Sequence, residues 1–196
     1  MFLVAGLGNP GEQYLRTPHN LGFLTMDRLA ERHGIRITRK ESKALVGLGE
    51  IDGQEVMLAK PQTFMNLSGT SLAPLMERHS VSADRLVVVY DELDLPWLSL
   101  RIKPKGSPAG HNGMKSVIAS LGTSDLVRVR LGIHPGRPLR SGAEFVLAPV
   151  RRSQEKELDG FVGYAADAVR SIIAEGVAQA MTKFNRRAPG LNIEEA

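Results

Sequence analysis

The sequence contains no cysteine among its 196 residues, and aromatic residues make up only 5% of it, with a single tryptophan. The lack of cysteine excludes disulfide bonds, thiolate metal ligands and a cysteine nucleophile within the chain. No apolar run approaches the roughly 20 residues of a membrane-spanning helix. The N-terminal apolar run is too short, and lacks the basic lead, for a secretory signal. The 42% of hydrophobic and 23% of charged residues are instead typical of a globular domain.

Acidic residues are scarce in one segment, residues 97–140. This segment holds eight Lys or Arg and a single acid, Asp125, although the whole chain has a net charge of only +4. Such a separated positive field attracts a polyanion such as a nucleic acid. A basic, solvated face without a partner remains the alternative interpretation. No Lys/Arg-rich tail and no low-complexity tract accompanies the segment.

Helix and strand patterns alternate along the whole chain. Short apolar or alternating runs predict strands over residues 2–7, 44–51, 54–59, 85–90, 100–103 and 127–133. Apolar residues at helical spacing predict helices over residues 21–33, 70–79, 114–121, 158–173 and, after Gly176, up to about 184. Asp52-Gly53 predicts a hairpin turn between the second and third strands. We therefore expect one α/β domain over residues 1–196, with a mixed, partly parallel twisted β-sheet and helices packed on both faces.

Polar loops follow four of the predicted strands, and in α/β sheets such loops form the site. They begin after residues 7, 59, 90 and 103. Asp91 comes directly after the run RLVVVY, which is apolar enough for a central strand. Asp91 is therefore expected to be part-buried and to need a hydrogen-bond donor.

Two of the five histidines, His19 and His111, lie in these loops and each precedes an asparagine. A histidine that donates one ring N–H to a carboxylate has its tautomer defined, and its other nitrogen can act as a base. His33 and His79 lie near predicted helix ends and are interpreted as structural or solvated. No spacing of histidines and carboxylates predicts a metal site.

Three loop asparagines, Asn9, Asn66 and Asn112, can hold a carbonyl, a ribose hydroxyl or a water molecule beside such a histidine. Local turn capping is the alternative for each of them.

Gly6, Gly8 and Gly11 match the G-x-G-x-x-G pattern of dinucleotide-binding proteins directly after a strand. That pattern requires a helix to open at the loop so that its N-terminus can hold the pyrophosphate. Pro10 and Pro18 interrupt any helix before residue 20. We therefore expect no nucleotide cofactor, and the chain also lacks a P-loop motif and a G-x-S-x-G elbow.

Five segments together resemble the bacterial-type peptidyl-tRNA hydrolases, and the resemblance extends from residue 6 to residue 185. These segments are GLGNPGEQYLRTPHNLGF, KPQTFMNLSG, VVYDELDLP, GHNGMKSV and VRVRLGIHPG. Their common order and usual spacing make the resemblance highly specific. It implies a monomeric, cytoplasmic hydrolase that acts in translation and ribosome rescue, cleaves the ester between peptide and tRNA, and uses neither metal nor cofactor.

The resemblance also implies a role for each matching residue. His19 would activate the attacking water, Asp91 would orient His19, and Asn9 would position the ester or the terminal nucleotide. Asn66 and Asn112 would hold the peptide backbone and the water. Tyr14, Met65 and His111 would line the groove. Lys103 and Arg130, both inside the basic segment, would clamp a tRNA phosphate.

The sequence departs from the family pattern at three places. Pro18 stands where the family usually has an arginine, Pro108-Ala109 replaces part of a glycine-rich stretch, and Pro74 interrupts a predicted helix. We expect these changes to affect substrate affinity and loop motion rather than the reaction. Two other functions stay open from the residues alone: an RNA-binding protein that has lost hydrolysis, and a nucleotide-cofactor enzyme.

Overall fold

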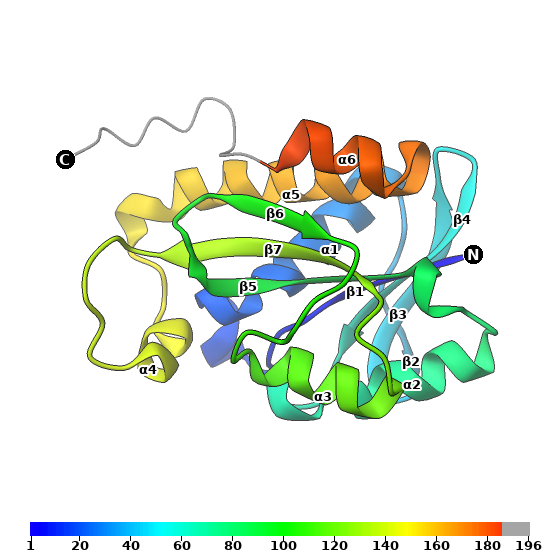
Figure 1. Ribbon diagram of the computed structural model, residues 1–196, viewed down its shortest axis with the longest axis horizontal. Helices are drawn as coiled ribbons and strands as arrows, with labels where there is room; N and C mark the ends of the chain where they lie inside the picture. Colours follow the sequence, from blue (N-terminus) through cyan, green and yellow to red (C-terminus); the bar gives the residue numbers. More distant parts are fainter. Residues whose placement is uncertain (186–196) are drawn as a thin grey trace.

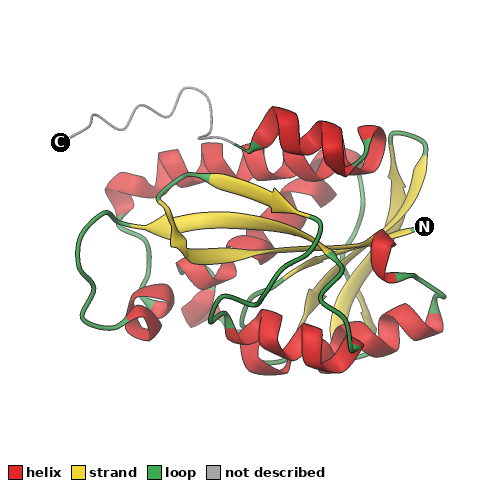
Figure 2. Ribbon diagram, in the orientation of Figure 1, coloured by secondary structure: helices red, strands yellow, loops and turns green. Residues whose placement is uncertain are grey.

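The computed structural model describes residues 1–185, and its centre is a seven-stranded sheet in the order β2-β3-β4-β1-β5-β7-β6 (Figures 1 and 2). The strands are β1 (Phe2–Gly6), β2 (Arg39–Glu41), β3 (Ala44–Ile51), β4 (Gln54–Pro61), β5 (Leu86–Pro96), β6 (Leu100–Lys103) and β7 (Val127–His134). β1 runs parallel to β4 and β5, and β5 runs parallel to β7. The remaining pairs are antiparallel. The predicted mixed sheet is therefore confirmed.

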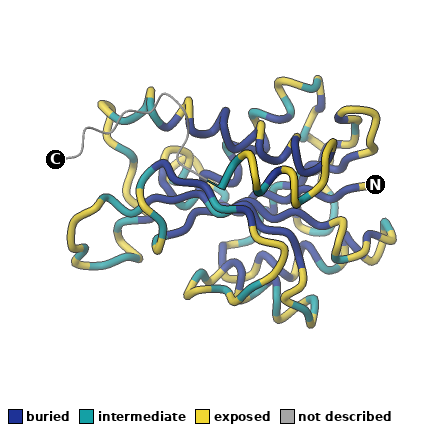
Figure 3. Tube along the Cα trace, turned by 45° about the horizontal axis from the view of Figure 1, so that its top comes forward, coloured by how far each residue is buried: buried dark blue, intermediate teal, exposed yellow. Residues whose placement is uncertain are grey.

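Helices cover both faces of this sheet, as the sequence predicts. The α-helices are α1 (Leu21–His33), α2 (Gly69–Arg78), α3 (Asn112–Leu121), α4 (Gly142–Leu147), α5 (Glu155–Glu175) and α6 (Val177–Phe184). α1, α5 and α6 lie on one face, whereas α2 and α3 lie on the other (Figure 1). Val87 and Val89 of β5 face the first layer, and Val88 and Tyr90 face the second. Residues 86–92 of β5 are all buried, because helices cover this stretch on both sides. The tube coloured by burial shows that the buried segments gather at the centre of the molecule (Figure 3).

Several local predictions are confirmed in detail. α1 spans Leu21–His33 and ends at Gly34, whose φ of 64° is the left-handed conformation that glycine adopts without a steric penalty. Asp52 and Gly53, with φ of 49° and 78°, form the tight turn that pairs Ile51 with Gln54. Within residues 1–185, none of the helices is long and apolar enough to cross a membrane.

One predicted loop is wrong, and the difference matters for the site. β5 does not end at Tyr90 but continues to Pro96, with irregular pairing to β7 between Glu92 and Pro96. Asp91 and Glu92 are therefore buried inside a strand. Asp91 and Glu92 can be buried within a paired strand because each has an imidazole or cationic partner, described below.

Two elements, β2 and α4, are absent from the sequence-based prediction. β2 is only three residues long and exposed, so it has no apolar pattern. α4 does have a local signal: Ser141 caps it by accepting a hydrogen bond from the Glu144 N–H at 3.2 Å. Ser141 and Glu144 have the spacing of a capping box. Pro74 lies inside α2 rather than at its start.

Gly6 and Gly8 of the G-x-G-x-x-G pattern are explained by close packing. A Cβ atom on Gly6 would lie 2.1 Å from the carbonyl oxygen of Gly22, and one on Gly8 would lie 2.8 Å from the Phe23 ring. Between β1 and α1 the chain makes two 3-10 turns, η1 (Glu12–Tyr14) and η2 (Pro18–Asn20), instead of opening a helix at the glycines. Gly6 and Gly8 thus allow α1 to pack closely against β1 and the residues that follow it.

Candidate active site

Most of the predicted site residues meet around one cavity of about 570 Å³ that lies after the carboxyl end of β1 and beside residues 91–94 of β5. This volume lies within the usual range of ligand sites, roughly 300–1,000 Å³. Eight of the ten predicted residues line it: Asn9, Tyr14, His19, Met65, Asn66, Asp91, His111 and Asn112. Lys103 and Arg130 lie outside it, on β6 and β7.

The segment that carries His19 is held by a reciprocal contact between two asparagines. The Asn9 backbone N–H donates to Asn20 Oδ1, and Asn20 Nδ2 donates to the Asn9 carbonyl, both at 2.9 Å. Asn20 is buried and follows His19 directly, so η2 is tied to the loop after β1. Pro18 fits the first position of η2, where no backbone N–H is needed. The sequence-based prediction gave Asn20 no role, because no local pattern reveals a contact across eleven residues.

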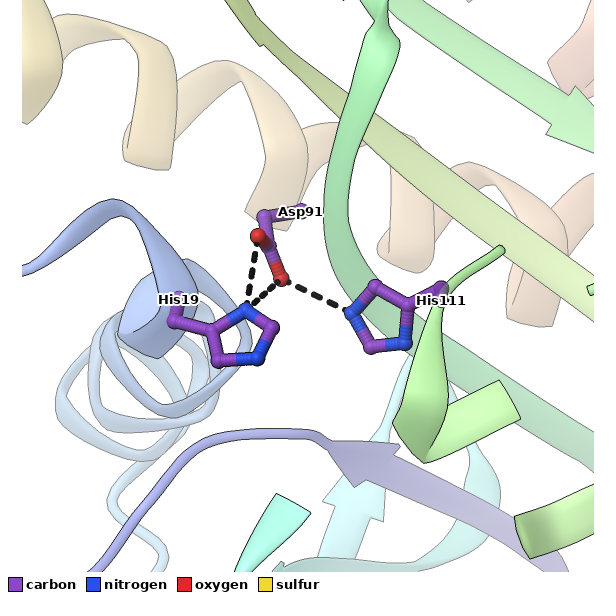
Figure 4. A group of neighbouring side chains, drawn as sticks. All are labelled: His19, Asp91 and His111. Carbon is purple, nitrogen blue, oxygen red and sulfur yellow. Dashed lines mark hydrogen bonds and ion pairs between the residues drawn. The ribbon is translucent and has the colours of Figure 1, made fainter. Parts of the chain in front are cut away.

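A His–Asp–His cluster forms the centre of the cavity (Figure 4). His19 Nδ1 lies 2.9 and 2.8 Å from the two carboxylate oxygens of Asp91. His111 Nε2 lies 2.9 Å from Asp91 Oδ1. The Asp91 side chain is only 2% exposed, against 13% for His19. Asp91 is thus a buried acceptor between two imidazoles, and His19 is the more accessible of these.

The tautomer of His111 follows from its position as the N-cap of α3. Its Nδ1 accepts a hydrogen bond from the Met114 backbone N–H at 3.2 Å. The proton of a neutral His111 therefore resides on Nε2, which donates to Asp91. The Tyr90 ring, 4.8 Å from the His111 ring, packs against it.

Asp91 is held ionised by these neighbours. Burial by itself would raise the pKa of its carboxyl group, but the charge and hydrogen bond of His111, followed by those of His19, outweigh burial and hold that pKa well below its ordinary value. An ionised Asp91 accepts the Nδ1–H of His19. Nε2 of His19 then keeps its lone pair and can act as a base.

The same three side chains also have the composition of a metal site, since their ligand atoms lie within 4.8 Å of one another. A metal would need the lone pair of His111 Nε2, the atom that carries the proton. If this proton moved to Nδ1, the Nδ1–H of His111 would face the backbone N–H of Met114 at the start of α3, and neither donor would have an acceptor there. The hydrogen-bonded arrangement therefore suits the cluster better than metal coordination.

Two further segments bring hydrogen-bond donors to the cavity. Asn9 Oδ1 accepts the Met65 backbone N–H at 2.8 Å, so the Asn9 amide is oriented and its Nδ2 remains a donor. Asn112 is the first residue of α3, where the helix dipole and the first backbone N–H groups favour negative charge. Both residues line the cavity.

The basic residues of β6 and β7 form a cluster on one face of the sheet. Antiparallel pairing places Arg101 opposite Arg130 and Lys103 opposite Arg128. Arg128 is 1% exposed and donates to the carbonyls of Ser107 and Ser124 at 2.9 and 2.8 Å. Arg130 is paired with buried Glu92 at 3.1 Å. Lys103 is exposed, so the two predicted clamp residues differ in how available their charges are.

Further residues line the cavity that the sequence-based prediction missed. They are Phe64, Glu92, Leu93, Asp94, Ala109, Gly110, Gly142, Ala143, Val146 and Leu147. Four of them belong to α4, which the capping pattern at Ser141 could have revealed. Glu92, Leu93 and Asp94 follow Asp91 in β5, and Phe64, Ala109 and Gly110 carry no local signal because apolar and glycine residues are common in any loop.

The fold and the cluster define a class of protein: an α/β protein whose cavity holds a buried carboxylate between two histidines. The profile of a family described as Peptidyl-tRNA hydrolase matches residues 3–191. The chain is 78% identical to a peptidyl-tRNA hydrolase of Solibacter usitatus over the full length of both, and 47% identical to one of Koribacter versatilis, with coverage of 95% and 94%. The crystal structure of the Acinetobacter baumannii peptidyl-tRNA hydrolase superposes with a TM-score of 0.88 at 32% identity, covering 96% of each chain. The chain belongs to the peptidyl-tRNA hydrolase family.

Proposed function

We propose that this chain hydrolyses the ester between the peptide and the 3′ ribose of tRNA, with His19 as the base that activates water. The observation that carries this proposal is the contact of His19 Nδ1 with buried, ionised Asp91 at 2.8 Å. Family membership supports the reaction and substrate class. A role in translation follows from the substrate.

The reaction needs only groups that the chain supplies and one water molecule. His19 Nε2 takes a proton from the water as its oxygen attacks the ester carbonyl carbon, and Asp91 stabilises the imidazolium. The tetrahedral intermediate collapses, the bond to the 3′ oxygen breaks, and Nε2 returns the proton to that oxygen. General-base assistance of this kind contributes roughly 10²–10⁴ in rate.

The other cavity residues support these steps in the proposal. Asn9 Nδ2 holds the ester beside His19, and the donors at the start of α3, with Asn112, stabilise the developing oxyanion. Asn66, Tyr14 and Met65 bind the peptide and the terminal nucleotide. His111 acts through Asp91 as a positioning residue.

A non-catalytic RNA-binding protein on this fold is not supported. His19, Asp91, Asn9, Asn66 and Asn112 are all present and line one cavity. The relatives at 78% and 47% identity are hydrolases by name. We further propose that the enzyme is a cytoplasmic monomer, which sedimentation at several concentrations would test for the oligomeric state.

The direct test is peptide release from N-acetyl-aminoacyl-tRNA in the presence of EDTA. We expect fast release that EDTA does not slow, because the His111 tautomer removes the Nε2 lone pair that His111 would need to complete a three-ligand metal site with His19 and Asp91. Zinc added after EDTA treatment should not raise the rate. Loss of activity in EDTA with recovery on adding a metal would contradict the proposed mechanism, and no release by folded protein would contradict the proposed function.

Replacing Lys103 gives the more direct of two tests of the proposed contact with a tRNA phosphate. We expect Lys103→Ala to raise KM and to reduce the slope of log KM against log salt by about one, since each phosphate contact releases about one counterion. Lys40→Ala, an equally exposed lysine on the opposite edge strand, is the matched control. An unchanged slope would exclude Lys103 from the clamp.

Arg130 must be tested differently, because it neutralises Glu92. Arg130→Ala leaves a carboxylate that is 2% exposed without its partner, which costs about 3–5 kcal/mol of stability. Arg130→Ala combined with Glu92→Gln should restore much of that stability. A remaining rise in KM in this double variant would report the phosphate contact itself.

A further inference from the structure

We propose that a second cavity, on the other side of η2 from the active site, binds an unpaired nucleotide of the tRNA close to its esterified 3′ end. The cavity has a volume of about 310 Å³ and lies among η2, the end of β5, the loop after β7, and α4 with the segment that follows it. This inference rests on the proposed function, because it assigns a part of the same substrate.

The two cavities share their walls. Pro18 lines the second cavity, whereas the next residue, His19, lines the active site. Phe145 of α4 lines the second cavity, whereas Val146 lines the active site. Consecutive Cα atoms are about 3.8 Å apart, so only a single layer of residues separates the two sites. A substrate whose 3′ terminus occupies the first cavity therefore brings its adjacent nucleotides to the second.

Aromatic and proline side chains form the apolar part of the cavity wall, where a nucleobase can stack. Trp97 and Phe145 are partly exposed there, beside Pro18, Pro135 and Pro149. Trp97 is held at the end of β5 by its backbone N–H, which donates to the His134 carbonyl at 2.9 Å. The indole Nε1–H of Trp97 donates to Glu157 Oε2 at 3.5 Å, and an indole held in this way is a suitable stacking platform for a base.

Two arginines give the cavity its positive charge. Arg137 and Arg151 line it, both are exposed, and neither makes a salt bridge with any residue of the described range 1–185. By contrast Arg16, in the loop before η2, is paired with Glu155. Available guanidinium groups beside stacking surfaces match a phosphate and its base. Every nucleotide carries a base for the stacking surfaces and a phosphate for the arginines. Among peptides, only an acidic one would supply negative charge to the arginines, so a nucleotide is the better occupant.

Trp97 is the only tryptophan of the chain, so its fluorescence reports on this cavity alone. We expect the trinucleotide CCA, the unpaired 3′ end of tRNA, to quench this fluorescence in a saturable way. Arg137→Ala with Arg151→Ala should weaken the binding about tenfold or more, since these arginines supply the phosphate contact. The control, Arg36→Ala with Lys40→Ala, removes the same charge from exposed positions near the opposite edge of the sheet and should bind like the parent.

Three results would overturn the proposal. They are no saturable quenching by CCA, equal weakening in the control variant, or quenching by an acidic N-acetyl peptide in place of CCA. The last result would assign the cavity to the nascent peptide.

Kinetics separate this inference from the proposed function. Trp97→Ala should raise KM for N-acetyl-aminoacyl-tRNA about tenfold. KM for N-acetyl-aminoacyl-adenosine, which lacks the preceding nucleotides, should stay unchanged. Equal loss on both substrates would show that Trp97 supports the catalytic geometry instead, which contradicts the nucleotide site. If the parent protein hydrolyses neither substrate, the proposed function itself fails, whatever the fluorescence shows.

Discussion

Replacing His19 by alanine is expected to lower kcat for peptidyl-tRNA hydrolysis by about 10²–10⁴-fold, because the variant lacks the imidazole that takes the proton of the attacking water in the proposed mechanism. His19 is the accessible member of its cluster, with a side chain 13% exposed, and its Nδ1 is held by Asp91. Affinity for deacylated tRNA should be nearly unchanged, since the basic cluster lies on β6 and β7. Single-turnover peptide release and a tRNA binding titration measure the two quantities.

His33→Ala is the matched control for this variant. His33 lies in the last turn of α1, outside the active-site cavity, and its replacement should leave both quantities unchanged. If His19→Ala loses tRNA binding and thermal stability together with activity, His19 is structural and the proposed base is wrong. If it keeps most of its activity, another group activates the water.

Asp91→Asn is expected to lower the rate by a similar factor, about 10²–10⁴, although the side chain keeps its size. The Met114 N–H makes His111 donate through Nε2, so the single acceptor oxygen of the new amide stays with His111. The amide NH₂ group then faces His19 Nδ1. A hydrogen bond from this NH₂ group, at the position of Oδ2 2.8 Å from Nδ1, makes His19 accept there and carry its proton on Nε2, the atom that should act as a base.

The measurements for Asp91→Asn are kcat/KM and the proton position on His19, observed by ¹⁵N NMR. Asp94→Asn is the control, because Asp94 lines the same cavity but is exposed. Asp94→Asn removes the same negative charge from a carboxylate that contacts no histidine of the described residues, and it should reduce activity only slightly. Full activity in Asp91→Asn, or a proton still on Nδ1 of His19, would contradict the assigned tautomers.

Asp91 should also contribute to the pH dependence of stability. Its pKa is lower in the folded protein than the ordinary value of about 3.9, so its stabilising contribution is present above that value. The contribution is lost as the pH falls through the lower, folded pKa. The difference in unfolding free energy between the parent and Asp91→Asn should therefore shrink on acidification from pH 7 to about pH 3. If this difference in unfolding free energy instead grows on acidification, the ionised Asp91 carboxylate destabilises the folded protein, which contradicts the prediction.

Much of the fold could be predicted from local patterns. The helix at 21–33, the hairpin at Asp52-Gly53 and the long C-terminal helix depend on spacing and turn chemistry that a short window contains. The continuation of β5 through Asp91 and Glu92 could not be predicted in this way. Acidic residues indicate a loop unless partners from distant segments neutralise them, and His19, His111 and Arg130 are such partners.

By itself the sequence determined the family, the order of the longer helices and strands, and eight of the residues that line the cavity, because their types and spacing are properties of the chain alone. Tertiary structure decided which nitrogen of His111 carries the proton, that Asn20 anchors η2, and that Glu92 neutralises Arg130 while Lys103 remains exposed. It also brought Pro18, Trp97 and Arg151 to one cavity. These features depend on hydrogen bonds and contacts between segments far apart in the chain, and the energies of such contacts arise only when folding brings the segments together.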